Sequence, residues 1–287
     1  MWLDRLLCLP QYLLPQHTLS RLAGRLASCR ARFWKNAFIG WFVRRYGVDM
    51  SEAAEPNPRA YGDFNSFFTR ELRSGIRPQP EEPTALACPV DGAVSQAGPI
   101  ENGLLVQAKG HSYTVTDLLG GDPQRAAPFA GGTFATLYLS PRDYHRIHMP
   151  LDGRLTEMLH VPGRLFSVNP LTARGVPGLF ARNERVVTLF DTDLGPMALV
   201  LVGATIVAGI ETVWSGTVTP PTANAVIRWE YAESAVQLRR GAEMGRFRLG
   251  STVILLFGPG AVTLDAAIRP SAPVRLGQLL GLPATHA

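Results

Sequence analysis

From about residue 87 onward the chain is divided into short apolar runs, and this division limits the folds open to it. Gly, Pro and Asp separate the runs, and β-branched residues are frequent within them, as is typical of strands. The runs lie at residues 133–139, 155–161, 186–190, 198–210, 225–231 and 252–257. Their lengths and spacing predict an antiparallel β sandwich or barrel-like core over residues 86–287.

The first 50 residues have a different periodicity. Apolar residues recur at three- and four-residue steps, as in Leu19-Leu22-Leu26, with arginines between them, and this pattern is typical of amphipathic helices. Two interpretations are open: the helices cover the core, or they lie in a membrane interface with Trp2, Trp34 and Trp41 at headgroup depth. Both hold if the helices dock on the core and present one face outward.

A connector rich in turn formers joins these two regions. Prolines and glycines are frequent over residues 51–85, and a short helix is expected near residues 64–72. The fold class is therefore α+β and mainly β. We expect N-terminal amphipathic helices at 1–50, the connector at 51–85 and a β-rich catalytic domain at 86–287.

Charge, the longest apolar run and the cysteine spacing limit the partners and the kinds of site open to the chain. The formal charge is +5, but the body has no Lys/Arg run, so we expect anionic lipid and not nucleic acid as the partner. The longest apolar run, 197–210, is shorter than the roughly 20 residues that span a bilayer and predicts a buried strand pair. The three cysteines, Cys8, Cys29 and Cys88, have no paired spacing, which argues against disulfides and structural zinc.

The Gly250-Ser251 pair opens the last apolar run and has two interpretations. In the ordinary one it is a turn at the start of a strand. In the other, the Ser251 hydroxyl attacks the preceding carbonyl, and a residue without Cβ permits that approach best. The resulting ester eliminates, and loss of ammonia leaves a pyruvoyl group on the new N-terminus. Such a ketone forms a Schiff base with an amine and accepts electrons from a breaking C–CO2 bond.

His145 and His148 stand close together in a segment that ends at Pro150, and three interpretations are open for them. They are ordinary histidines with satisfied nitrogens, or they form a partial metal-ligand set with Asp91. In the third interpretation, one of them is the general base for Ser251 and Asp91 orients it. Asp91 alone, before Gly92, is equally well a turn carboxylate.

Several segments, taken in order, carry a resemblance that covers nearly the whole chain. They are Phe67-Phe68-Thr69-Arg70, Pro89-Val90-Asp91-Gly92, Ala108-Lys109-Gly110-His111 and residues 138–150, 165–169, 180–185, 202–205 and 243–252. The set is similar to the bacterial, membrane-associated form of the phosphatidylserine decarboxylase family. The family's Leu-Gly-Ser-Thr cleavage motif stands unaltered at residues 249–252.

The resemblance implies a proenzyme that cuts itself between Gly250 and Ser251 and turns Ser251 into a pyruvoyl cofactor, with no metal. Asp91, His148 and Ser251 match the family's self-processing triad, and His145 matches a neighbouring active-site histidine. The implied reaction converts phosphatidylserine to phosphatidylethanolamine and CO2 in phospholipid biosynthesis.

The resemblance also implies the assembly and its location. A β chain, residues 1–250, and an α chain, residues 251–287, form a heterodimer that can dimerise further. The implied location is the cytoplasmic face of the bacterial inner membrane, where the protein is peripheral and binds phosphatidylserine and other anionic lipid.

Two other functions stay open from the residues alone. One is a metal-dependent hydrolase of β architecture that uses His145, His148 and Asp91, which stoichiometric zinc would favour. The other is a membrane-binding β module without enzymatic activity, which a single intact chain on a denaturing gel would favour.

Overall fold

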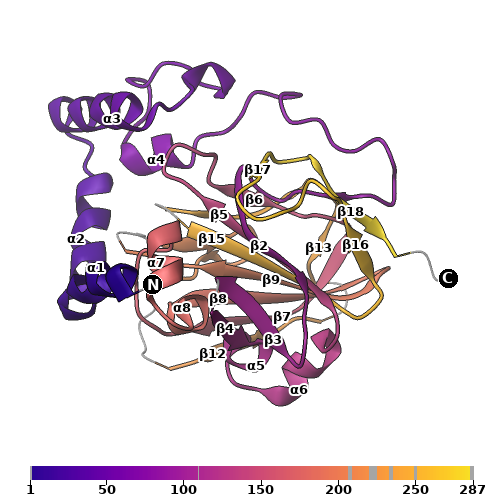
Figure 1. Ribbon diagram of the computed structural model, residues 1–287. Coiled ribbons are helices and arrows are strands. Elements are labelled where there is room, and N and C mark those ends of the chain that lie inside the picture. The colour runs from indigo at the N-terminus through magenta and orange to yellow at the C-terminus, as the bar shows by residue number, and fades with distance from the viewer. Residues whose placement is uncertain are drawn as a thin grey trace.

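Three helices at the N-terminus lie to one side of a β-rich body (Figure 1). The computed structural model describes residues 2–108, 110–205, 209–219, 225–232, 235–248 and 251–284. Its helices are α1 (Trp2–Leu13), α2 (Gln16–Ala27), α3 (Arg32–Tyr46), α4 (Phe64–Phe68), α5 (Val115–Leu118), α6 (Pro123–Ala126), α7 (Pro170–Gly175) and α8 (Leu179–Arg182), with 3-10 turns η1 (Met50–Glu52) and η2 (Ala127–Phe129).

A large antiparallel sheet forms the centre of the body. Its strand order is β12 (Ile227–Glu230), β7 (Gly153–Val161), β8 (Arg185–Thr192), β9 (Gly195–Val202), β15 (Ser251–Phe257), β5 (Thr133–Leu139), β2 (Gly92–Pro99) and β17 (Pro273–Val274), and β13 (Gln237–Leu238) also pairs with β7. Within the described residues the two edges do not meet. The sheet is therefore open, and the antiparallel, mainly β prediction is confirmed without a closed barrel.

Three smaller sheets surround it. One has the order β11 (Gly216–Thr217), β10 (Ile210–Thr212), β14 (Glu243–Phe247) and β6 (Arg146–His148). Another has the order β1 (Leu86–Ala87), β18 (Leu279–Pro283) and β16 (Val262–Leu264), and the third pairs β3 (Leu104–Ala108) with β4 (His111–Thr114).

The large sheet is buried on both faces. Along β15, Val253 and Leu255 belong to a core shared with the β6-containing and β18-containing sheets. Ile254 and Leu256 alternate with them and belong to a second core under α5 to α8. Because alternate residues of a strand point to opposite faces, β15 contributes to both cores and reads as one continuous apolar run.

The N-terminal helices are docked by specific polar contacts. The Gln11 side chain accepts from Ser167 N at 2.9 Å, and Gln16 Oε1 accepts from Leu165 N at 2.8 Å. The α1 helix packs against α7 (Figure 1). Gly175 on α7 permits this approach, because a Cβ there would lie 2.6 Å from Cys8 Sγ. The helical prediction for the N-terminal segment is confirmed.

The same helices leave a row of apolar side chains exposed. It comprises Trp2, Leu6, Leu7, Leu9, Leu13, Leu14, Leu19, Leu22, Leu26, Phe33 and Trp41, of which Leu13 (88%) and Phe33 (82%) are the most exposed. We call this set the apolar N-terminal face. None of the described helices is long and apolar enough to cross a bilayer.

The predicted strand bounds hold best where burial is complete. The run at 133–139 is β5 with the same limits. The strand pair predicted for 197–210 does not form: β9 ends at Val202, and Ile210 begins β10 in a different sheet, while residues 206–208 lie outside the described residues. The helix expected near 64–72 ends at Phe68, because Leu72 is extended and forms a β-bridge with Ala53.

Strand β15 therefore gives a stability prediction. Leu255→Ala removes a fully buried side chain and should lower the free energy of unfolding by about 2–5 kcal/mol. Leu282→Ala, at a 44% exposed strand position, should cost less than about 1 kcal/mol. Urea titration of both variants in a Ser251→Ala background compares them as single chains. Equal midpoints would contradict the central role of β15.

Candidate active site

One edge of the large sheet collects the residues singled out by the sequence. Strands β2 and β15 pair with opposite sides of β5, both antiparallel, so they begin at the same edge. Ser251 opens β15 opposite Leu139, and Asp91 immediately precedes β2, whose Ala93 lies opposite Tyr138. With neighbouring strands ~4.8 Å apart, the backbones at Asp91 and Ser251 lie roughly 10 Å from each other.

Gly92 allows Asp91 to sit at this edge. A Cβ on Gly92 would lie 2.3 Å from the carbonyl oxygen of Tyr138, far inside contact distance. Only glycine therefore fits where β2 meets the end of β5, and it fixes the neighbouring Asp91 beside the segment that leaves β5.

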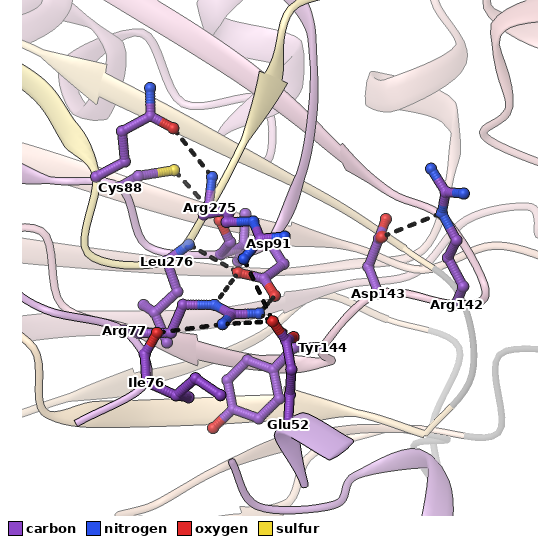
Figure 2. Close-up of polar contacts among 12 residues, drawn as sticks. Glu52, Ile76, Arg77, Cys88, Asp91, Arg142, Asp143, Tyr144, Arg275 and Leu276 are labelled. Atoms are coloured by element: carbon purple, nitrogen blue, oxygen red, sulfur yellow. Dashed lines mark hydrogen bonds and ion pairs between the residues drawn. The ribbon is translucent and has the colours of Figure 1, made fainter. Parts of the chain in front are cut away.

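The Asp91 carboxylate is held by an arginine fork. Figure 2 shows Arg77 between Asp91 and Glu52: its Nε donates to Asp91 Oδ1 at 3.0 Å and its Nη2 to Oδ2 at 2.6 Å. The backbone N–H of Leu276 also donates to Asp91 Oδ1 at 2.8 Å. Two parallel charge-assisted bonds are the strongest form of this contact, and they fix the orientation of the carboxylate.

Arg77 links three parts of the chain. Its Nη2 also donates to Glu52 Oε2 at 2.6 Å, and Arg275 reaches Glu52 Oε1 at 3.3 Å. Hydrogen bonding to Asp91 and Glu52 raises the pKa of Arg77 despite its burial. Asp91 is thus joined both to the connector and to the segment that follows β15.

His148 lies near Asp91 but uses both ring nitrogens elsewhere. Its backbone N–H donates to Pro89 O at 3.0 Å, which brings it beside the Asp91 segment. Its Nδ1 contacts Gly241 O at 2.7 Å, and because a carbonyl only accepts, Nδ1 carries the proton. Nε2 therefore accepts from the Tyr144 hydroxyl at 3.0 Å. Burial lowers the pKa of His148, so the ring is held neutral.

His145 is fully buried and has a free nitrogen. Its Nδ1 donates to Asp143 O at 2.8 Å, and its ring packs on Phe68 with centroids 4.0 Å apart. Nε2 therefore bears a lone pair, and it has no hydrogen-bond partner. Burial lowers the pKa of His145 to about 3, so this lone pair is available at neutral pH.

The Ser251 hydroxyl is also buried without a hydrogen-bond partner. Thr252 Oγ1 beside it is in the same state, so the chemical role of Ser251 rests on its position at the start of β15 and on the motif, and the missing partner leaves its hydroxyl free to react. Gly250, the other half of the predicted cleavage site, lies outside the described residues, as does Leu249.

Asp91 and Ser251 thus lie at the same end of the large sheet, and His148 of the neighbouring sheet lies beside the Asp91 segment, but the residues do not form a hydrogen-bonded triad. Asp91 is bound to Arg77 and Leu276, and His148 is bound to Gly241 and Tyr144, so Asp91 does not hold the imidazole of His148 as expected. Sequence reasoning also missed Arg77 and Tyr144. Tyr144 directly precedes His145, whereas Arg77 lies in an irregular connector that carries no periodic signal.

A second buried arginine stands behind this edge. Arg70 is 5% exposed and donates through Nη2 to Arg142 O at 3.1 Å and to Asp143 O at 3.5 Å. Its Nη1 is buried without a partner, and burial lowers its pKa. Among the described residues no carboxylate forms an ion pair with Arg70, in contrast to Arg77, although attraction to Asp91, Asp143 and Glu52 partly opposes the lowering of its pKa.

The metal-hydrolase interpretation finds no support in this geometry. Among the described residues no group of three or more His, Cys, Asp or Glu side chains could hold a metal ion. Asp91, the proposed third ligand, is neutralised by Arg77 instead.

Comparisons with known proteins agree on one family. A family model described as phosphatidylserine decarboxylase matches residues 64–282, and a second model, described as PSD, matches residues 6–47. A relative from Bordetella pertussis (strain Tohama I) is 62% identical over 99% of this chain and 96% of its own length. Relatives from Pseudomonas entomophila (strain L48; 61%, covering 98% and 99%) and Pseudomonas aeruginosa (strain LESB58; 60%, covering 98% and 98%) are similar. All three are named phosphatidylserine decarboxylase proenzyme.

The contacts of His145 give a pH prediction. The unfolded chain takes up a proton near pH 6.5, whereas folded His145 resists protonation down to about pH 3. The unfolded state therefore binds more protons between these values, and His145 contributes a loss of stability as pH falls through this window. His145→Gln should remove part of that slope. Nitrogen-15 NMR of Ser251→Ala protein should show a neutral ring protonated on Nδ1 at pH 6; an Nε2–H form would contradict the assignment.

Proposed function

The chain belongs to the phosphatidylserine decarboxylase family, and on this premise we propose that it cuts itself before Ser251 and then decarboxylates phosphatidylserine to phosphatidylethanolamine and CO2. The observations that support the site assignment are a buried serine hydroxyl without a hydrogen-bond partner at the start of β15, the Asp91 carboxylate directly before β2, and two histidines whose pKa burial lowers.

Self-cleavage begins with the Ser251 hydroxyl, which attacks the carbonyl carbon of residue 250. A neutral imidazole takes the hydroxyl proton, and we assign this step to His148 with Asp91 as its ionic neighbour. Because both His148 nitrogens are engaged, His148 must first release the Tyr144 hydroxyl from Nε2. Asp91 stays ionised through the Arg77 fork and stabilises the imidazolium that forms.

His145 is assigned to proton transfer in the decarboxylation. Its Nδ1 is fixed by Asp143 O, and its free Nε2 lone pair takes or returns a proton without a change of tautomer. Phe68 packs on the ring and keeps water from it.

The Ser251 position fits a self-derived pyruvoyl group. The Ser251 hydroxyl has no hydrogen-bond partner to lose, and the strand that Ser251 opens is hydrogen-bonded to β5 and β9, so a new N-terminus there stays anchored at the site. Once formed, the group supplies a ketone that captures the substrate amine and accepts electrons from the breaking C–CO2 bond. The β chain, 1–250, and the α chain, 251–287, then remain together as a heterodimer.

The apolar N-terminal face supports peripheral attachment to a membrane. Its side chains are exposed on helices whose other faces dock through Gln11 and Gln16. Such a surface, flanked by arginines, suits the interface of a bilayer that contains anionic lipid. We assign the protein to the cytoplasmic face of the bacterial inner membrane.

The first prediction from this function concerns the cut. Purified wild-type protein should run as two chains, whereas Ser251→Ala lacks the nucleophile and His148→Ala lacks the base, so both should stay intact. His145→Gln should be cut but decarboxylate about 10²-fold more slowly. Denaturing gels, intact-mass analysis and release of CO2 from phosphatidylserine measure these outcomes.

The control is Ser112→Ala, which removes an exposed hydroxyl on β4 and should leave the cut and the activity unchanged. A normal cut in Ser251→Ala would remove the basis for the whole mechanism. A normal cut in His148→Ala, with none in His145→Gln, would exchange the roles of the two histidines.

The second prediction concerns the membrane. Replacing Leu6, Leu13 and Phe33 together with Gln should reduce binding to vesicles of phosphatidylglycerol and phosphatidylethanolamine by about tenfold or more, since each apolar side chain buried in lipid contributes roughly 1–3 kcal/mol. Vesicle flotation gives the measurement, and self-cleavage should persist. The matched control replaces Val106, Val213 and Leu282 with Gln, because these apolar residues are exposed outside the N-terminal helices. An equal loss of vesicle binding in both triple variants would contradict a membrane-binding role specific to the apolar N-terminal face.

A further inference from the structure

A pocket of about 550 Å³ opens beside the active-site edge. Gly92, Tyr138, Ser140 and Asp143 contribute to its lining, and Arg142 and Arg174 line it as well. We propose that Arg142 and Arg174 bind the phosphodiester of the substrate head group in this pocket. The inference rests on the proposed function and adds the residues that recognise a phospholipid in place of free serine.

The position of the pocket matches the length of a lipid head group. Ser140 directly follows Leu139, the strand partner of Ser251, so the pocket begins next to the reacting residue. In phosphatidylserine, three covalent bonds separate the reacting carbon from phosphorus, a span of about 4 Å. A phosphodiester about 4 Å from the reacting carbon would therefore lie close to the segment that follows Leu139 and carries Arg142.

The two arginines are available for an anion. Arg142 is 69% exposed and lies 3.8 Å from Asp143 Oδ1, as Figure 2 shows, and Arg174 is 51% exposed and lies 3.5 Å from Asp4 Oδ2. These ion pairs are long and solvated, so they contribute little and exchange readily. Asp143 is partly occupied already, because its Oδ2 accepts from Ser140 N at 2.7 Å.

Arg70 makes the same segment more positive. It donates to the carbonyl oxygens of Arg142 and Asp143, and among the described residues no carboxylate forms an ion pair with it. Asp91, Asp143 and Glu52 lie near enough to attract it but do not contact it. Its positive charge therefore adds to that of Arg142 where a phosphodiester would bind.

The charge balance of the reaction favours phosphate over carboxylate as the ligand. The carboxylate loses its charge as CO2 forms, so an arginine bound to it would stabilise the substrate more than the transition state. The phosphodiester keeps its charge throughout. Binding it stabilises both states equally, which lowers KM without slowing the chemical step.

The outer wall of the pocket leads toward the membrane helices. Val168, Pro170 and Ala173 line it beyond the arginines, and they belong to α7 and the segment before it. The α7 helix packs on α1, and Arg174 pairs with Asp4 of α1. Glycerol and acyl chains can therefore leave the pocket along an apolar wall toward the apolar N-terminal face.

The test replaces both arginines in the matured enzyme. Arg142→Gln/Arg174→Gln should self-cleave normally, raise KM for phosphatidylserine about tenfold or more and change kcat less than about threefold. Calorimetry with soluble glycerophosphoethanolamine should show an equal loss of affinity, whereas ethanolamine, which lacks phosphate, should bind the variant and wild type alike.

The matched control is Arg228→Gln, a 54% exposed arginine paired with Glu157 and Glu230 at the far edge of the sheet. It should behave as wild type. A loss of binding to anionic vesicles without any loss for glycerophosphoethanolamine would overturn the proposal and make the pair a membrane contact. Loss for glycerophosphoserine alone would instead assign the arginines to the carboxylate.

If the double variant fails to fold, Arg142→Gln and Arg174→Gln are measured as single variants. Each should show part of the rise in KM for phosphatidylserine. A wild-type protein that neither cuts itself nor releases CO2 would contradict the proposed function. An active wild type with unchanged variants would contradict only the assignment of these two arginines.

Discussion

The hydrogen-bonded ladder of β15 is the constraint on which the rest of the structure depends. All seven residues from Ser251 to Phe257 are buried, and the strand pairs with β5 on one side and β9 on the other. It supplies apolar side chains to the cores on both faces of the sheet. The proposed cleavage point is the first residue of this strand, so the chemistry takes place where the fold is held most firmly.

Charge is distributed around that edge in two different ways. The charge of Arg77 is paired with two carboxylates: Asp91 and Glu52 accept hydrogen bonds from its guanidinium group, and the backbone N–H of Leu276 also donates to Asp91. Arg70 instead donates to the carbonyl oxygens of Arg142 and Asp143 and forms no ion pair with a described carboxylate. The first arrangement fixes an ionised carboxylate near His148. The second leaves positive charge under Arg142, where an anionic substrate approaches.

Local residue patterns and side-chain chemistry predicted several strands, the N-terminal helices and a set of candidate site residues from the sequence. The mainly apolar run at 133–139 specified β5 because most residues on both faces of that strand are buried, and the three- and four-residue apolar steps specified the N-terminal helices. Asp91, His145, His148 and Ser251 were predicted as site residues because their residue types suit the chemistry and their motifs resemble one family, and they remain proposals. Strand β2, rich in Gly, Ala and Ser and only partly buried, carried a weaker signal.

The contacts of these residues depend on long-range packing and could not be predicted. Arg77 meets Asp91 through an irregular connector, and Leu276 reaches it from 185 positions away. The tautomers of both histidines follow from the carbonyl groups of Asp143 and Gly241, which only the folded chain brings near.

If the chain is cut before Ser251 as proposed, the central place of β15 has a consequence for the lifetime of the product. An α chain whose first strand paired with a neighbour on one side only could dissociate on dilution, as a loosely bound peptide does. This one can leave only if β5 and β9 part and both cores open, which amounts to global unfolding. Its retention is therefore governed by the unfolding rate and is independent of protein concentration.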